Sequence, residues 1–138
     1  ASAFNNLGNT YSDQQKYDEA ILSYEKAIEL NHDDASAFNS MGFLYLQIGE
    51  LAKAQETLIQ AVEKGSQDFA NMNLGHVFLA LKQEEKAIKC YLKSLTAYSI
   101  KDQFWDGMKD DFQYLEQYGI TDEYFQGILE KIRGGNND

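Results

Sequence analysis

The sequence of 138 residues contains no proline and a single cysteine, Cys90. One cysteine cannot form a disulfide bond within the chain or supply a structural zinc site, so cysteine usage leaves the redox compartment open. Long apolar runs are also missing, since no stretch approaches the roughly 20 residues that a membrane-spanning helix requires. We therefore expect no membrane insertion.

Basic residues are scarce. Twelve lysines and arginines stand against 22 aspartates and glutamates, which gives a net charge of −10. The imbalance is greatest over residues 102–138, which hold nine acids and three bases. A surface of this sign repels phosphate backbones, so nucleic acid is not an expected partner. The apolar fraction of 43% is nevertheless that of a globular domain. The chain is also long enough to bury a core without a disulfide or a metal.

Residue sets for catalysis, metal binding or cofactor binding are not found. The sequence has no nucleophile motif and no phosphate-binding glycine loop, and its histidines, His32 and His76, lie 44 residues apart. A neutral surface position is favoured for His76, and a structural position for Cys90. Two acidic pairs, Asp110–Asp111 and Asp122–Glu123, are interpreted as solvated charge, because adjacent helical residues point in different directions. The sequence predicts no enzyme, no metal site and no cofactor.

Repetition is what the sequence has in quantity. ASAFNNLGNTY opens the chain, ASAFNSMGFLY follows 34 residues later, and a weaker third copy follows after another 33. Apolar residues in each copy recur at i, i+3, i+4 and i+7, which predicts one face of a helix. A second helix of about 13 residues is predicted to follow each one, beginning near residues 17, 51 and 84.

A glycine stands at the same place in each first helix: Gly8, Gly42 and Gly75. Glycine inside a helix costs about 1 kcal/mol relative to alanine, so its recurrence indicates a packing requirement. We expect these glycines to let two helix backbones cross closely. A single helix pair is too thin to bury its own apolar face, so the pairs are predicted to stack into a continuous core.

These copies resemble the tetratricopeptide repeat, whose pattern is W-x2-L-G-x2-Y followed by A-x3-F, A and P. The first copy has the family's residues at five places and aromatic substitutes at two: Leu7, Gly8, Tyr11, Ala20 and Ala27, with Phe4 and Tyr24 as the substitutes. The second copy keeps Gly42, Tyr45, Ala54 and Ala61. The resemblance covers residues 1–101, without the family's closing proline.

The resemblance implies an all-α fold, a right-handed superhelical solenoid of antiparallel helix pairs. We expect three tetratricopeptide units and a divergent C-terminal capping pair within one solenoid domain. The expected boundaries are residues 1–34, 35–67 and 68–101 for the units, 102–133 for the capping pair and 134–138 for a disordered tail. The chain begins inside the first unit without methionine, which favours a fragment or a processed product and leaves the compartment unassigned.

The capping pair departs from the repeat pattern. Lys109 stands where the glycine is expected, and Ile128 stands where a small residue is expected. Helices are predicted over residues 103–118 and 122–133, with Gly119 ending the first and Thr121 capping the second.

First helices of such repeats line a concave groove, so the resemblance implies a binding stripe beside each core face. The stripe changes from amide-rich through apolar to acidic along the chain. Its expected members are Asn5, Asn9, Asn39, Phe43, Leu46, Phe69, Met72, Asn73, His76, Leu79, Asp106 and Asp110. The apolar members fit internal packing as an alternative, if the solenoid curls tightly or the tail folds back. The asparagines fit either ligand contact or ordinary repeat composition.

One type of ligand is argued against. Family members that hold the C-terminal carboxylate of heat-shock chaperones use lysines, an arginine and two asparagines. The five corresponding places here hold Asn5, Asn9, Ser40, Phe69 and Asn73, of which only Asn9 matches. With no cation among them, the sequence predicts no clamp for such a carboxylate.

The favoured function is a non-enzymatic module that binds a peptide segment of a partner protein. We expect an apolar anchor of the ligand against Phe43, Met72 and Leu79, and a ligand Lys or Arg near Asp106 and Asp110. Two alternatives stay open. The chain could self-assemble into a homo-oligomer through an uncapped first helix, or serve as the accessory domain of a larger enzyme or secretion machine.

Overall fold

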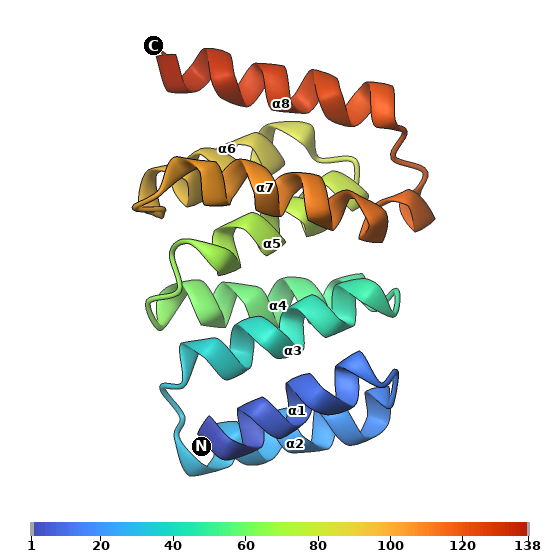
Figure 1. Ribbon diagram of the computed structural model, residues 1–138, viewed down its shortest axis with the longest axis vertical. Helices are drawn as coiled ribbons and strands as arrows, with labels where there is room; N and C mark the ends of the chain where they lie inside the picture. The colour runs from blue at the N-terminus through green and yellow to red at the C-terminus, as the bar shows by residue number, and fades with distance from the viewer. Residues whose placement is uncertain (1, 138) are drawn as a thin grey trace. The chain divides into compact units, whose positions relative to one another are not determined.

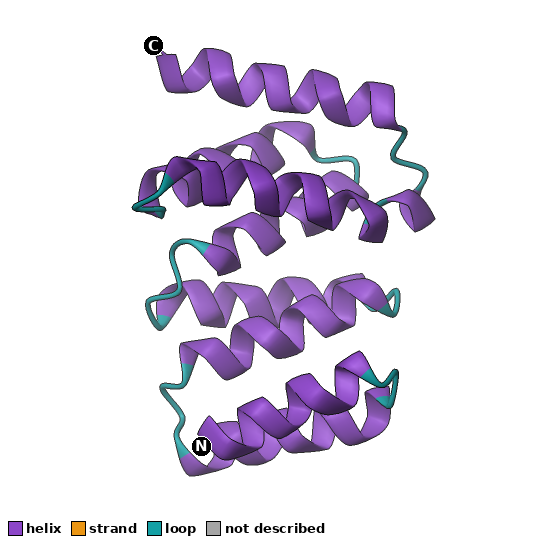
Figure 2. Ribbon diagram, in the orientation of Figure 1, coloured by secondary structure: helices purple, strands orange, loops and turns teal. Residues whose placement is uncertain are grey.

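The computed structural model describes residues 2–137, with side chains described as far as residue 135 (Figure 1). Helices make up all the regular structure of this part of the chain (Figure 2), which confirms the all-α prediction. Contacts divide the chain into two compact units, residues 1–66 and 67–138, and each unit is described by itself. The stacking of all the repeats into one solenoid domain stays a prediction. Among the described helices, none has the length and apolarity needed to cross a bilayer.

Unit 1 consists of two antiparallel helix pairs. Its helices are α1 (Ser2–Asp13), α2 (Tyr17–Leu30), α3 (Ala35–Gln47) and α4 (Leu51–Glu63). Helix α3 packs against both α1 and α2. Ala20 and Tyr24 of α2 form a buried cluster with Met41 and Leu44 of α3, so the second pair covers the apolar face of the first, as the repeat pattern predicts.

The turn inside each of the first three helix pairs has one geometry. Gln15, Gly49 and Lys82 occupy equivalent places and have positive φ angles of 62°, 88° and 63°. The residue after each of them donates its N–H to a carbonyl five residues back, at 2.8–2.9 Å, which is the helix-ending Schellman bond. Glycine accepts this left-handed conformation without strain, whereas Gln15 and Lys82 are held in it by the surrounding bonds.

The recurrent glycines mark the crossing point of each pair. A Cβ atom would lie 2.5 Å from Tyr24 Cε1 at Gly8, from Leu58 Cγ at Gly42, and from Tyr91 Cε1 at Gly75. No side chain fits at such a distance. The predicted packing role of these glycines is therefore confirmed.

Unit 2 contains one regular pair and a divergent C-terminal part. Its elements are α5 (Phe69–Ala80), α6 (Glu84–Ala97), α7 (Lys101–Asp111), the 3-10 turns η1 (Phe112–Tyr114) and η2 (Glu116–Tyr118), and α8 (Asp122–Asn137). The helix predicted over 103–118 thus ends at Asp111 and continues as 3-10 turns. Two predictions here are confirmed: Gly119 ends η2 with φ +80°, and Thr121 Oγ1 accepts the Tyr124 N–H at 3.1 Å.

The structure differs from the predicted disordered tail at residues 134–137, where α8 continues. Gly135 lies beside Leu92 of α6, where a Cβ atom would be 3.4 Å from Leu92 Cδ1. The last turns of α8 are therefore in contact with α6. This contact offsets the low helix propensity of the two glycines, Gly134 and Gly135. Residue 138 lies outside the described part of the chain.

Helices α7 and α8 do not form a tight pair like the others. Helix α8 packs on α6 instead, and α7 packs on α6 as well (Figure 1). Lys109 occupies the place of the crossing glycine, and Phe125 occupies the place of Tyr24, Leu58 and Tyr91. A lysine side chain cannot enter a crossing that excludes a single Cβ atom, which explains why the fourth pair opens.

Candidate functional site

The expected binding stripe is half buried in the structure. Six of its twelve residues are at most 7% exposed: Asn5, Leu46, Met72, Asn73, His76 and Leu79. Their expected place on an open groove is corrected accordingly, because side chains this deeply buried cannot meet a ligand at the surface. Internal packing, the alternative interpretation of the apolar stripe, describes Leu46, Met72 and Leu79.

Helix α7 covers two members of the stripe on α5, Met72 and His76. Gly107 lies directly over Met72, since a Cβ atom there would be 3.2 Å from Met72 Cε. One turn further along α5, His76 reaches Asp111 at the end of α7. The divergent C-terminal part of unit 2 therefore covers the face of α5 that the repeat pattern predicts to be open.

His76 is the centre of a buried polar network, and its predicted surface position is wrong. The side chain is fully buried. Its Nδ1 lies 2.8 Å from Tyr91 Oη of α6, and its Nε2 lies 3.1 Å from Asp111 Oδ2 of α7. An ionised Asp111 only accepts, so Nε2–H donates to it and Nδ1 accepts the Tyr91 O–H. Burial, followed by the charge of Asp111, raises the pKa of Tyr91 well above its usual value.

Asp111 also corrects the interpretation of the acidic pair at 110–111. Its carboxylate is 19% exposed and binds His76, whereas Asp110 is exposed. The two carboxylates do point in different directions, as expected. Only Asp110 is solvated charge.

Asn9 has the same structural role in unit 1 as His76 has in unit 2. Tyr24 Oη donates to Asn9 Oδ1 at 2.6 Å, and the two pairs share a spacing of 15 residues. In the second repeat Leu58 has no hydroxyl group, and Phe43 stands at the equivalent place. A tyrosine 15 residues after Asn9 and after His76 was therefore the sequence signal that these two side chains bind a buried hydroxyl group.

Asn5 bridges two helices of unit 1. Its Nδ2 donates to Ser36 Oγ of α3 at 3.0 Å, while its Oδ1 is buried without a partner. The amide therefore fixes α1 against α3. This contact accounts for Asn5 without a ligand.

The rest of the stripe remains accessible. Asn9, Phe69, Asp106 and Asp110 are exposed, and Asn39 and Phe43 are half-buried. Phe69 is 55% exposed and meets Tyr98 edge to face, with 5.5 Å between ring centroids. The carboxylates of Asp106 and Asp110 have no hydrogen-bond or ion-pair partner among the described residues.

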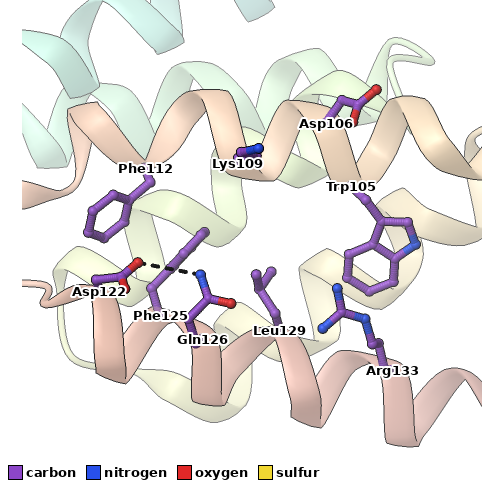
Figure 3. A pocket seen from close by; sticks show the side chains of 9 residues that line it. All are labelled: Trp105, Asp106, Lys109, Phe112, Asp122, Phe125, Gln126, Leu129 and Arg133. Carbon is purple, nitrogen blue, oxygen red and sulfur yellow. Dashed lines mark hydrogen bonds between the residues drawn. The ribbon is translucent and has the colours of Figure 1, made fainter.

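A pocket of about 410 Å³ opens between α7 and α8 (Figure 3). Trp105 and Phe112 point into it from one side, and Phe125 and Leu129 from α8 on the other. Charged and polar side chains complete its lining: Asp106, Lys109, Asp122, Gln126 and Arg133. Of these residues the expected stripe contained only Asp106. Lys109 in place of the glycine was the signal in the sequence that this helix pair is open.

The pocket's aromatic wall already binds a cation. The Arg133 guanidinium lies 4.6 Å from the centre of the Trp105 ring, a cation–π contact (Figure 3). Lys109 has no ion-pair partner among the described residues, whereas Lys131, on the same helix as Arg133, lies 2.8 Å from Glu84 Oε2. No group of residues suited to hold a metal ion occurs in the described part of the chain.

Buried tyrosines make stability depend on alkaline pH. Burial, with nearby acids as lesser causes, raises the pKa of Tyr24 and of Tyr98 from 10.0 to about 12. Unfolded tyrosines ionise near pH 10 while these stay neutral, so stability is complete below pH 10 and falls as the pH rises toward 12. Circular dichroism is expected to show unfolding in this window, together with a rise in tyrosinate absorbance. Ionisation of all nine tyrosines near pH 10 without loss of helix would contradict the burial of these hydroxyls.

Comparison with known proteins assigns the class of this protein. Family models described as "TPR repeat" and "Tetratricopeptide repeat" match residues 8–49 and 70–100. The chain belongs to the tetratricopeptide repeat family. The first TPR domain of human RPAP3 has a similar structure, with a TM-score of 0.69 and 24% identity over 84% of this chain and 92% of that domain. The first TPR of Spaghetti (RPAP3), solved bound to the HSP90 peptide SRMEEVD, is equally similar.

Similar curated proteins are several times longer than this chain. The protein STIP1 homolog of Dictyostelium discoideum is 28% identical over 93% of this chain and 24% of its own length. Heat shock protein STI1 of Saccharomyces cerevisiae is 34% identical over 69% of this chain and 17% of its own length. The chain therefore spans a quarter or less of these relatives.

Proposed function

We propose that the chain is a non-enzymatic interaction module that binds a peptide segment of a partner protein. Membership of the tetratricopeptide repeat family carries the proposal, because repeat proteins of this kind use extended surfaces for binding. The relatives add support, since one similar domain was solved with a peptide bound. The Plasmodium falciparum protein that is 29% identical over 64% of this chain is named Hsp70-Hsp90 organising protein.

The accessible part of the expected stripe supplies the binding surface. In unit 2 it consists of Phe69, Asp106 and Asp110, and in unit 1 of Asn9, Asn39 and Phe43. The surface of unit 2 is acidic, and two of its carboxylates have no partner within the chain. A ligand with Lys or Arg beside an apolar side chain suits this surface best.

An acidic C-terminal peptide does not suit this surface. The five places that would hold its carboxylate contain no cation, and Asn5 and Asn73 among them are buried. The similar domain that holds SRMEEVD therefore supports peptide binding by this fold, and we propose a ligand of different chemistry for this chain.

A comparison of two peptides tests the proposal. A short apolar peptide flanked by lysines is expected to bind saturably, and SRMEEVD is expected to show no low-micromolar binding in the same fluorescence anisotropy assay. Replacing Asp106 and Asp110 by Asn is expected to weaken the first peptide about twofold to fivefold for each ion pair and to flatten its salt dependence. Tight binding of SRMEEVD, or no effect of the two substitutions, would overturn the charge preference.

Self-association is the second candidate function. Three leucines of the first helix pair are unusually exposed: Leu7 at 40%, Leu22 at 65% and Leu30 at 55%. Exposed leucines of this kind can be covered by a second copy of the chain.

A further inference from the structure

The apolar anchor of a ligand needs a site other than the one expected on α5. Met72 and Leu79, the expected contacts, are only 3% and 0% exposed. The pocket between α7 and α8 is the apolar opening nearest to Asp106, which is part of its lining. Its volume of about 410 Å³ lies within the range of ligand pockets, about 300–1,000 Å³.

The pocket exists because the fourth helix pair has lost its crossing contact. In the other pairs a ring or a leucine fills the space over the glycine, whereas here Lys109 stands at that place and is exposed. The counterpart of those side chains, Phe125, is buried, whereas Trp105 and Phe112 are left half-buried. An apolar side chain from outside can complete this packing.

The surface beyond the pocket's own lining favours a cationic ligand. The lining is balanced, with Asp106 and Asp122 against Lys109 and Arg133, whereas residues 102–138 as a whole carry nine acids and three bases. Asp106 and Asp110 on α7, with Asp122 at the start of α8, leave three exposed carboxylates on or beside the opening. A basic segment would be attracted to this surface, and an acidic one repelled.

Arg133 shows what the wall of the pocket accepts. Its guanidinium covers Trp105 from within the chain, with the geometry that a ligand arginine would use. The side chain is exposed, so it can turn away when another cation arrives. Arg133 therefore acts as an internal competitor for the ligand's positive charge.

From these observations we infer that the α7–α8 pocket binds the apolar anchor of a basic peptide segment of the partner. One apolar or aromatic side chain packs against the half-buried rings of Trp105 and Phe112, while neighbouring Lys or Arg residues meet Asp106 and Asp122. The inference rests on the proposed function and names both its anchor site and its partner's chemistry.

Trp105 makes the inference directly testable, because it is the only tryptophan of the chain and it lines the pocket. A short peptide with one phenylalanine between lysines, itself free of tryptophan, is added to the whole chain. Trp105 emission is expected to shift saturably, in step with the anisotropy of a labelled copy of the peptide. Replacing the peptide's phenylalanine by alanine is expected to weaken binding about tenfold or more. A matched peptide with glutamates in place of the lysines is expected to bind more weakly.

Two variants of the chain are expected to change the affinity for the peptide in opposite directions. Gln126→Phe fills the pocket from an exposed position and is expected to abolish binding. Arg133→Ala removes the internal competitor and is expected to tighten binding about twofold to fivefold. Lys131→Gln is the matched control, because it changes the net charge equally on the same helix but at the ion pair with Glu84, and a smaller effect is expected. Circular dichroism confirms that each variant is folded.

Different failures have different meanings. Peptide binding that Asp106→Asn weakens, but that leaves Trp105 emission unchanged and survives Gln126→Phe, overturns the pocket and leaves the proposed function standing. Stronger binding of the glutamate peptide overturns the partner's chemistry. Absence of saturable binding by both readouts overturns the inference and the proposed function together.

Discussion

Replacing Gly75 by alanine is expected to lower the free energy of unfolding of unit 2 by about 1–3 kcal/mol, the usual cost of overpacking. The expected sign is unusual, because alanine in place of a helical glycine ordinarily stabilises by up to about 1 kcal/mol. Here the new Cβ would meet the Tyr91 ring at 2.5 Å. The ring cannot easily move, since it is fully buried and its hydroxyl is bound to His76. Denaturant unfolding followed by Trp105 fluorescence measures the change within the same unit.

Gly127 provides the matched control for this substitution. It lies inside α8, and a Cβ atom there would have no neighbour within 4 Å. Gly127→Ala is therefore expected to stabilise the chain by about 0.5–1 kcal/mol. If both substitutions stabilise, the crossing of α5 and α6 is not tight, and the packing role of the recurrent glycines would be withdrawn.

Replacing His76 by alanine is expected to destabilise unit 2 by about 3 kcal/mol. The substitution opens a cavity in a fully buried site, and it leaves the Tyr91 hydroxyl without its acceptor. It also removes the only contact shown between the Asp111 carboxylate and α5. His32, which is exposed, is the matched control, and His32→Ala is expected to change stability by less than about 0.5 kcal/mol.

A double-mutant cycle separates the hydrogen bond from the cavity. Tyr91→Phe removes the hydroxyl and keeps the ring, so the coupling with His76→Ala is expected to be about 0.5–3 kcal/mol. Strictly additive losses would mean that His76 acts through its volume alone. Equal effects of the two histidine substitutions would contradict the buried network itself.

The helix pairs and their crossing points could be predicted from the sequence because the same residues recur in each copy of the repeat. A glycine that recurs in three helices at the same place has few explanations, and each one meets a ring or a leucine of the next helix. The cap at Thr121 and the helix end at Gly119 followed from residue chemistry that acts over a few positions.

The binding stripe on α5 was misjudged because helical periodicity says which face is apolar, but not what covers it. Residues 70–80 are all buried, and the helix contains no aspartate, glutamate, lysine or arginine. A helix that is apolar on every side is surrounded by protein, and this composition was the available signal. That α7 supplies the cover depends on Gly107 and Asp111, which lie outside the regular repeats.

The pocket between α7 and α8 was only half predictable. Lys109 indicated that the crossing glycine was missing. The sequence did not show whether α7 and α8 would pack together at a different crossing point or stay apart. The separation of the two helices depends on the contact of α8 with α6, a relation between segments that no local pattern in the sequence describes.

The crossing contacts also affect how repeats can be added to such a chain by duplication. Gly8 meets Tyr24, Gly42 meets Leu58 and Gly75 meets Tyr91, so each contact joins residues of one repeat. A duplicated segment one repeat long therefore brings a complete crossing with it, including the side chain that the glycine must accommodate. Loss of one glycine, as at Lys109, alters only its own helix pair. The crossing contacts of the other pairs are unaffected.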